Sequence, residues 1–329
     1  GLIVADNDAL ARISGTLVSL ADAPKFKGKV KGSGKRLAGL IQAIADVGSL
    51  PGFLSQDFEF SGSVVASAGG AEIKDLGVRL GDINASGGLK VELSKIPVVA
   101  ARINVSSINL DRWLSLPPAQ RKPAAKRIKP ATAIKTAIKK ESGGVSPKAS
   151  ISLPKKIAKA RKAAPGFKIP ANIDGSLNLT VDSITARGQL VRRILANAEL
   201  ASGEITLSQL SAQFPGGSDI AVFGFITAAD GQPKFEGEME VTVNDPRGML
   251  RWLGTAMPPV PADRLRKLTL ASRFTATPKR IETNSLDLQF DSSRLTGGVT
   301  LALRAPLAFG ADLTLDRLNM DAYLAAPGA

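Results

Sequence analysis

Two residue types that carry much of protein chemistry are missing from this sequence of 329 residues, because it contains no cysteine and no histidine. Without cysteine there is no disulfide framework, no thiol nucleophile and no thiolate metal site. Without histidine the chain lacks the usual general base near neutral pH, the Ser-His-Asp triad and the commonest zinc sites. We therefore expect a protein that is not an enzyme and that holds no metal and no other cofactor.

Aromatic residues and long apolar runs are also scarce. Phe, Trp and Tyr make up 5% of the chain, whereas hydrophobic residues as a group make up 44%, so a core must come mainly from aliphatic side chains. No run approaches the roughly 18 to 20 apolar residues that span a bilayer, and no secretory signal is present. Because the sequence opens at Gly1 without an initiator Met, we expect that it was cut from a longer chain and that any membrane anchor lay outside it.

The net charge of +14 is concentrated in one segment. Between Ser115 and Pro170 there are 15 Lys and Arg residues and a single acid, Glu141, so this segment alone accounts for the net charge. Its richness in Lys, Ala and Pro predicts a flexible basic linker over 116–171. A solvated spacer, contact with an anionic membrane surface and nucleic-acid binding are all open to such a linker. Phe167 is its only aromatic residue, which disfavours base stacking and hence nucleic acid.

Most of the remaining sequence alternates between apolar and polar residues with a period of two, which is typical of strands with one apolar face and one wet face. One example runs from Phe235 to Val243, where Glu236, Glu238 and Glu240 occupy the alternate positions. Asn, Asp and Gly between such runs predict the turns. We expect a mainly β protein.

Helical patterns are few. In one, Leu37, Leu40, Ile41 and Ile44 fall at helical spacing, and Ser33 is a candidate cap. In the other, Asp245-Pro246 reads as an N-cap followed by proline at the first helical position, before the apolar stripe of Met249, Leu250 and Leu253. The sequence thus predicts at least two short helices.

An internal repeat links the two ends of the chain. The stretch Ile108–Leu114 recurs 210 positions later as Leu318–Leu324, and Gly87-Gly88 recurs as Gly297-Gly298. Pro24, Phe26 and Gly28 match Pro233, Phe235 and Gly237 at an offset of 209. A repeat of this length predicts one supersecondary unit used twice. We expect a first β unit over 1–115, truncated at its amino end, the linker over 116–171 and a second β unit over 172–329.

The recurring motif invites a catalytic interpretation, since Asp111 stands beside Arg112. In the second copy Arg112 is replaced by Ala322, whereas the acid and the apolar positions persist. We therefore interpret Asp111 as a helix N-cap, with Trp113 or Tyr323 packed under the end of the sheet. The structural repeat motif comprises Asn109, Asp111, Trp113, Asn319, Asp321 and Tyr323.

The charged strand faces differ in sign between the copies. Lys27, Lys29 and Lys31 align with Glu236, Glu238 and Glu240 at an offset of 209. A charged ligand would not be bound equally by both, so we expect solvated faces with cross-strand partners of opposite charge.

Three stretches of the second unit resemble the AsmA family of bacterial envelope proteins. They are Ile173–Leu179, Ala198–Leu207 and the close that begins at Leu318. The similarity covers most of 173–324, extends more loosely to 14–114 and leaves out the linker. It implies an elongated, twisted antiparallel sheet that is curled into an apolar groove. It also implies a periplasmic protein, anchored in the bacterial inner membrane, that takes part in phospholipid traffic and outer-membrane homeostasis.

The expected function is lipid binding or lipid transfer without catalysis. Phospholipid or another acyl-chain lipid is the expected partner, and other envelope proteins are possible partners. The candidate groove residues are Leu177, Leu179, Val181, Ile205, Leu207, Met239, Val241, Val243, Leu286, Leu288, Phe290, Val299, Leu301 and Leu303. The sequence leaves open a closed β-sandwich, in which two sheets cover each other, with a structural or adaptor role in the cell envelope.

Overall fold

The computed structural model describes residues 2–6, 9–18, 24–38, 52–115, 167–257, 260–317 and 323. The chain divides into one compact unit formed by 1–120 and 166–329 and a second, 121–165, which lies outside the described residues, as does most of the expected linker. The expected boundaries of two β units and a linker therefore stay a prediction. The larger unit is described below.

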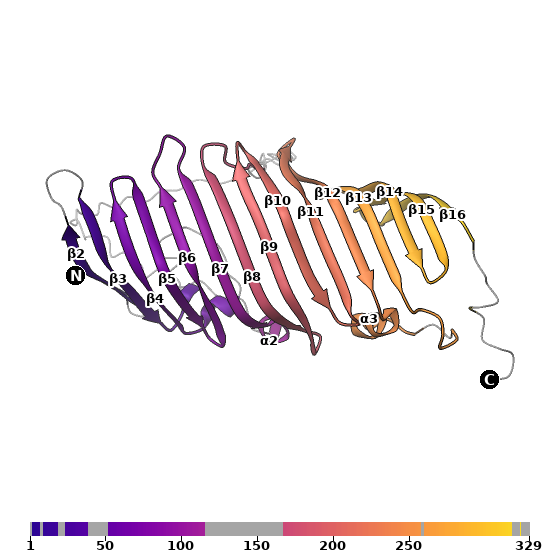
Figure 1. Ribbon diagram of the computed structural model, residues 1–329, viewed down its shortest axis with the longest axis horizontal. Helices are drawn as coiled ribbons and strands as arrows, with labels where there is room; N and C mark the ends of the chain where they lie inside the picture. The colour runs from indigo at the N-terminus through magenta and orange to yellow at the C-terminus, as the bar shows by residue number, and fades with distance from the viewer. Residues whose placement is uncertain are drawn as a thin grey trace, which may run out of the picture. The chain divides into compact units, whose positions relative to one another are not determined.

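Sixteen strands form one open sheet in which spatial order follows sequence order (Figure 1). The first seven are β1 (Leu2–Asp6), β2 (Ala9–Val18), β3 (Lys25–Gly34), β4 (Phe58–Ser67), β5 (Gly70–Leu80), β6 (Ile83–Glu92) and β7 (Val98–Asn109). The others are β8 (Asp174–Ala186), β9 (Gln189–Ala201), β10 (Glu204–Phe214), β11 (Ser218–Ala229), β12 (Gln232–Val243), β13 (Leu268–Thr277), β14 (Arg280–Phe290), β15 (Ser293–Ala302) and β16 (Ala308–Leu315).

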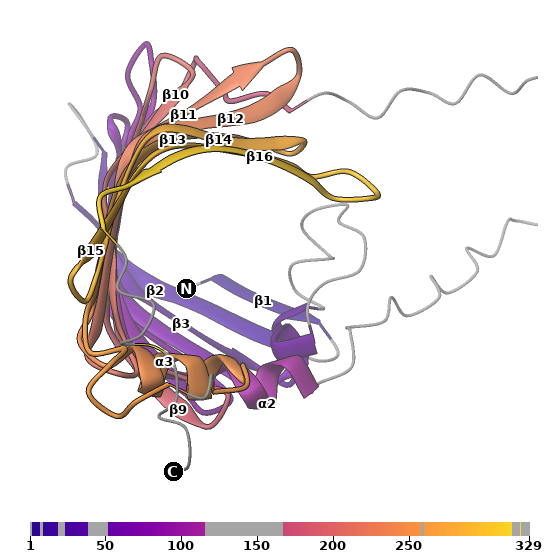
Figure 2. The same ribbon diagram turned by 90° about the vertical axis from the view of Figure 1, so that its right-hand side faces the viewer.

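The expected fold class is confirmed, since the unit is mainly β and its sheet is long, open and curled. Figure 2 looks along the sheet and shows its strands curving into a trough. The alternative of a closed sandwich is wrong, because the described strands form a single sheet and no second sheet faces it.

All neighbouring strands are antiparallel except β7 and β8, which are parallel. Val98 pairs with Asp174 and Asn109 pairs with Thr185, so the two ranges separated by the expected linker continue one sheet. Parallel neighbours need a connection that returns along the strand. The end of β7 and the start of β8 therefore lie at opposite ends of these two strands.

The repeat seen in the sequence recurs in the strand boundaries. β4, β5 and β6 begin at Phe58, Gly70 and Ile83, and β13, β14 and β15 begin 210 residues later. Two hydrogen bonds between backbone groups recur at the same offset: Leu93 N donates to Gly69 O at 2.8 Å, and Leu303 N donates to Lys279 O at 2.8 Å.

The matching glycines of the repeat allow close approach between strands. A Cβ on Gly28 would lie 2.3 Å from Ser14 O and 2.6 Å from Cζ of Phe26. In the second copy, a Cβ on Gly237 would lie 2.2 Å from Phe223 O and 2.7 Å from Cζ of Phe235. In both copies the phenyl ring covers the glycine, so any side chain there would clash with ring and backbone.

The helical elements that are described in full are η1 (Gly52–Ser55), α2 (Leu110–Ser115) and α3 (Pro246–Leu253). The prediction for α3 is confirmed, since Asp245 Oδ1 accepts a hydrogen bond from Gly248 N at 2.9 Å and Gly254 closes the helix in the left-handed conformation. In the first copy, Leu37 is helical, whereas Leu40, Ile41 and Ile44 lie outside the described residues. Ser33 is not a cap, because it lies within β3.

Candidate functional site

Strand register divides the sheet into two chemically different faces. Residues directly opposite each other in neighbouring strands share a face. Val241 of β12 lies opposite Ile220 of β11 and Leu270 of β13, whereas Glu240 lies opposite Ala221 and Ala271. We call the face that holds Val241 the inner face and the face that holds Glu240 the outer face.

The inner face is aliphatic from one end of the sheet to the other. Following the register from Val241 through the pairs from β2 to β16 assigns most of the apolar residues of the alternating strands to this face. Representative residues on the strands of the first copy are Ile13, Val30, Phe60, Val64, Ile73, Leu89, Ala101 and Ile103. Sequence reasoning placed the candidate groove in the second unit alone, because the β7–β8 pairing that joins the two faces has no local signal.

The register brings nearly all of the predicted groove residues together. Every one of them except Leu303 lies within a strand and on the inner face, as follows: Leu177, Leu179, Val181, Ile205, Leu207, Met239, Val241, Val243, Leu286, Leu288, Phe290, Val299 and Leu301. Leu303 follows β15 in an exposed turn. Their shared placement is a geometric finding; their contact with lipid stays a prediction.

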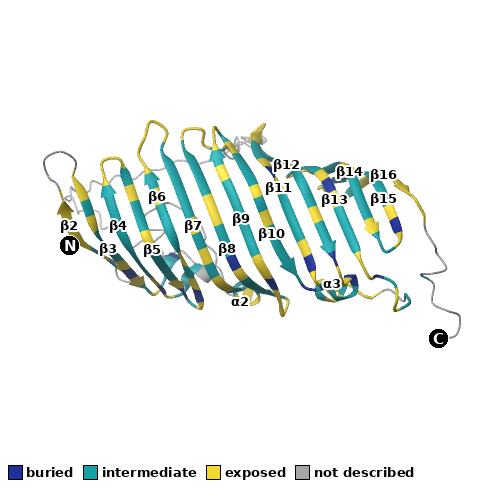
Figure 3. Ribbon diagram, in the orientation of Figure 1, coloured by how far each residue is buried: buried dark blue, intermediate teal, exposed yellow. Residues whose placement is uncertain are grey.

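The buried apolar side chains of the inner face gather at one set of strand ends. In Figure 3 most of the buried positions lie at the strand ends near α2 and α3. Phe58 is 3% exposed and Val243 is 5% exposed, and the hydroxyl of buried Ser218 donates to Pro215 O at 3.0 Å. The rest of this face is half-buried or exposed, with Leu177 and Ile281 each 37% exposed. The packed core therefore covers only one margin of a wide apolar surface.

Helix α3 forms part of that edge and lies on the inner side of the curve (Figure 2). The ring of Trp252 packs against Phe214 of the inner face with centroids 5.7 Å apart. Its indole Nε1 donates a hydrogen bond to Ala186 O at 2.9 Å, at the end of β8. A single side chain thus ties α3 to β8 and β10 and closes the edge of the trough.

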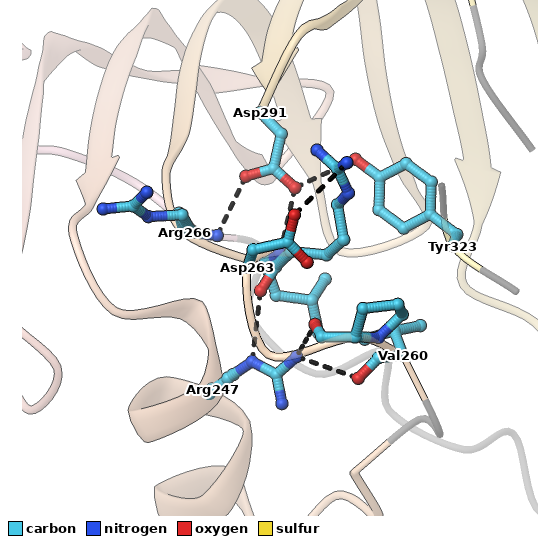
Figure 4. Close-up of polar contacts among 9 residues, drawn as sticks. Arg247, Val260, Asp263, Arg266, Asp291 and Tyr323 are labelled. Atoms are coloured by element: carbon cyan, nitrogen blue, oxygen red, sulfur yellow. Dashed lines mark hydrogen bonds and ion pairs between the residues drawn. The ribbon is translucent and has the colours of Figure 1, made fainter. Parts of the chain in front are cut away.

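The chain that follows α3 is held by Arg247 (Figure 4). Its guanidinium donates to the backbone oxygens of Arg264 at 3.1 Å and Val260 at 3.1 Å, and also to Pro261 O. Three carbonyls held by one planar cation fix this connection against the helix.

Asp291, in the turn after β14, collects several donors at the same edge. Its carboxylate accepts hydrogen bonds from the amides of Leu265 and Arg266 at 2.9 and 2.8 Å, and from the Tyr323 hydroxyl at 2.9 Å (Figure 4). Burial opposes ionisation, yet these bonds hold the pKa of Asp291 below its usual value. Burial and the bond to Asp291 raise the pKa of Tyr323. The ring of Tyr323 stacks on Phe290, with centroids 6.2 Å apart, which confirms that it packs at the end of the sheet.

Asp111 does not cap α2, contrary to the interpretation from sequence. The cap is Asn109, whose Oδ1 accepts a hydrogen bond from Arg112 N at 2.9 Å. Asp111 instead accepts from the amides of Gly188 at 2.8 Å and Arg187 at 2.7 Å, in the turn between β8 and β9. These bonds lower the pKa of Asp111. Trp113 is half-buried, and Asn319 and Asp321 lie outside the described residues.

The outer face of the second repeat is lined by paired charges. Glu238 binds Arg273, Lys234 lies 2.8 Å from Glu236, and Asp287 accepts two hydrogen bonds from Arg294. The Arg294 bonds lower the pKa of Asp287. Exposed Phe223 and Phe225 are the apolar exceptions on this part of the face.

The expected pairing of opposite charges fails in the first repeat. Lys27, Lys29 and Lys31 lie opposite Val65, Ser63 and Ser61 on β4, and none of these lysines has an ion pair with another described residue. The expectation from sequence therefore holds for Glu238, which binds Arg273 on the neighbouring strand. Glu236 pairs with Lys234 on its own strand, and Glu240 has no ion pair with another described residue. For the three lysines the expectation is wrong.

Polar chemistry on the inner face is sparse. Ser272 and Thr283 share a hydrogen bond of 2.8 Å, which uses their hydroxyls within the sheet. Among the described residues, no three Asp or Glu side chains gather in a way that could hold a metal ion. What this arrangement can do is remove apolar groups from water over a large area.

Comparison with family models, with curated proteins and with solved structures found no match to this chain. Among the described residues, no helix has the length and apolar character needed to cross a bilayer.

Proposed function

We propose that the inner face binds the acyl chains of phospholipid or of a related lipid, and that the chain carries lipid without catalysing a reaction. The observation that supports this is a continuous aliphatic face along the sixteen-stranded sheet that the described elements cover at one edge only. A large exposed apolar surface marks a binding site in a folded protein.

The dimensions of the inner face suit acyl chains. β12 has 12 residues, and at about 3.3 Å per residue the inner face is about 40 Å long when measured along this curved strand. Sixteen strands spaced by about 4.8 Å give a length of about 70 Å. One leaflet of the roughly 30 Å hydrocarbon core of a bilayer puts an acyl chain at about 15 Å, so several chains fit.

The inner face also indicates which part of a lipid is recognised. Burial of each CH₂ group is worth about 0.8 kcal/mol, and aliphatic side chains supply that gain without regard to the head group. Ser272 and Thr283 bond to each other, and the charged side chains of β12, β13 and β14 point to the outer face. Head groups would therefore remain at the open edge, in water, while the tails lie on the sheet.

The resemblance to the AsmA family adds a cellular setting to this proposal. On that basis the protein would act in the periplasm, anchored in the inner membrane by a segment outside this sequence. It would contribute to phospholipid traffic and outer-membrane homeostasis, with other envelope proteins as possible partners.

Site-specific photocrosslinking tests the proposal with two adjacent residues. Leu288 lies on the inner face and Gln289 on the outer face of β14. A benzoyl-phenylalanine at position 288 should capture phospholipid in the native envelope, whereas the same group at 289 should not. Native mass spectrometry of the gently extracted protein should show bound lipid. Lipid capture at neither position, or equally at both, would refute the inner face as the site.

A further inference from the structure

The outer face of β3 carries a lysine at every second position. Lys25, Lys27, Lys29 and Lys31 are all exposed. Alternate residues of a strand stand about 7 Å apart on one face, so the row is about 20 Å long. Neighbouring charges are closer than the Debye length of about 8 Å at physiological salt, and they therefore act as one cluster.

Among the described residues, no acid lies directly opposite this row. The residues directly opposite it are Ser67, Val65, Ser63 and Ser61 on β4, and Val18, Thr16, Ser14 and Arg12 on β2. Arg12 thus faces Lys31, and like charges placed opposite each other destabilise a sheet. The nearest acid by register is Glu59, diagonal to Lys31, and it binds Arg79 at 2.9 Å.

The repeat shows that this architecture does not require unneutralised charge. At the equivalent positions of β12, Glu236 and Glu238 have basic partners in Lys234 and Arg273, and only Glu240 has none among the described residues. Lysines can also protect an exposed sheet edge, but β3 is paired on both sides and is not an edge strand. A row of like charges costs stability, and here it serves no structural purpose. Such an arrangement is expected where the surface binds a partner.

We propose that this lysine row and Arg12 dock on the anionic head groups of a phospholipid bilayer. Each lysine near an anionic bilayer strengthens binding by about fivefold. Exposed Leu10 and Val18 flank the row on the same face and can enter the head-group region. The outer face of β2, β3 and β4 presents no aromatic side chain within the described residues, so it lacks the stacking platforms that favour single-stranded nucleic acid. This surface is opposite to the inner face and does not depend on the lipid site proposed there.

The natural absence of cysteine allows a local test. Ser14→Cys places a single thiol opposite Lys29, and Ser285→Cys places one on the outer face of β14. Each variant is labelled with the environment-sensitive dye NBD and mixed with phosphatidylcholine vesicles with or without phosphatidylglycerol. The dye at position 14 should brighten only with phosphatidylglycerol and lose this response in high salt, and the dye at 285 should not respond.

A charge series completes the test in the Ser14→Cys background. Changing Lys27, Lys29 and Lys31 to Gln should weaken vesicle binding by about 100-fold, at about fivefold for each lysine. Changing Lys74 and Lys90 to Gln should leave binding unchanged, because these outer-face lysines are already paired with Glu72 and Glu92. A circular dichroism melt should show that both variants remain folded.

The proposal would be overturned by equal brightening at both labels, by unchanged binding of the triple variant, or by a response to soluble DNA or heparin but not to anionic vesicles. The basic linker is present in every variant, so it cannot produce a difference between the two labels or between the triple variant and its parent.

Discussion

The Asp111 carboxylate accepts a hydrogen bond from Gly188 N at 2.8 Å, although 77 residues separate the two in the chain. Asp111 belongs to α2, at the end of the first repeat, and Gly188 to the first turn of the second repeat, where it has a φ of +71°. Together with the parallel pairing of β7 and β8, this contact makes one sheet of two repeats.

Removing the Asp111 carboxylate should weaken that junction. In Asp111→Ala, the amides of Arg187 and Gly188 lose their acceptor, so the melting temperature should fall and both amides should exchange hydrogen faster. Asp312→Ala, an exposed acid on β16, is the matched control and should change neither. Unchanged exchange at Gly188 in Asp111→Ala would contradict the assigned role.

Acid should destabilise the sheet at the strand ends that lie near α2 and α3. The folded-state pKa values of Asp111 and Asp291 lie below the ordinary aspartate value of 3.8, so their stabilisation is present above that value and is lost as pH falls through the lowered pKa values. The melting temperature should therefore be steady above about pH 4 and drop as pH falls below it. Asp291→Asn should show a shallower drop in the same titration, and a slope equal to that of the parent would count against this carboxylate.

Gly237 and Gly310 should respond in opposite directions to alanine. A Cβ at Gly237 would lie 2.2 Å from Phe223 O, so Gly237→Ala should cost about 1 to 3 kcal/mol of unfolding free energy. A Cβ at Gly310 meets no atom within 4 Å, and Gly310→Ala should be neutral or stabilise by about 0.4 to 1 kcal/mol. Urea unfolding of both variants provides the measurement, and equal effects would disprove the close approach at Gly237.

The connection between β7 and β8 should tolerate replacement but not removal. β7 has 12 residues and spans about 40 Å, a distance that needs about 12 extended residues to recross. Replacing 121–165 with about 20 Gly and Ser residues should preserve the melting temperature. Joining Ser115 directly to Pro170 leaves too short a chain and should break the β7–β8 pairing, which hydrogen exchange at Ile103 would reveal. Retained protection there would be inconsistent with parallel pairing.

A charge on the inner face should affect lipid more than fold. Leu301→Arg places a long cation in the open trough, where its head can reach water along the sheet. Bound lipid should decrease, while the melting temperature changes by less than about 4 °C. Thr300→Arg lies next to it on the outer face, opposite Glu282, and should keep the lipid. Unfolding of Leu301→Arg would indicate a closed core instead.

Local patterns in the sequence determined the strands, α3 and the repeat. Alternation between Val241 and Glu240 fixed their opposite faces, and Asp245-Pro246 fixed the start of α3, because each depends on residues only a few positions apart. The offset of 210 carried over into strand boundaries since each copy folds on the same local pattern.

Only the tertiary structure decided which strands from distant parts of the chain meet. The parallel pairing of β7 with β8, the contact of Asp111 with the β8–β9 turn and the placement of Lys29 opposite Ser63 all depend on register across strands. The alternation of apolar and polar residues along a strand predicts on which face of the sheet a side chain lies. It does not predict which residue of the neighbouring strand lies opposite. The physical reason is that the packing and hydrogen bonding of the whole sheet select the cross-strand partners. A local segment of sequence supplies only one of the two strands in each pair.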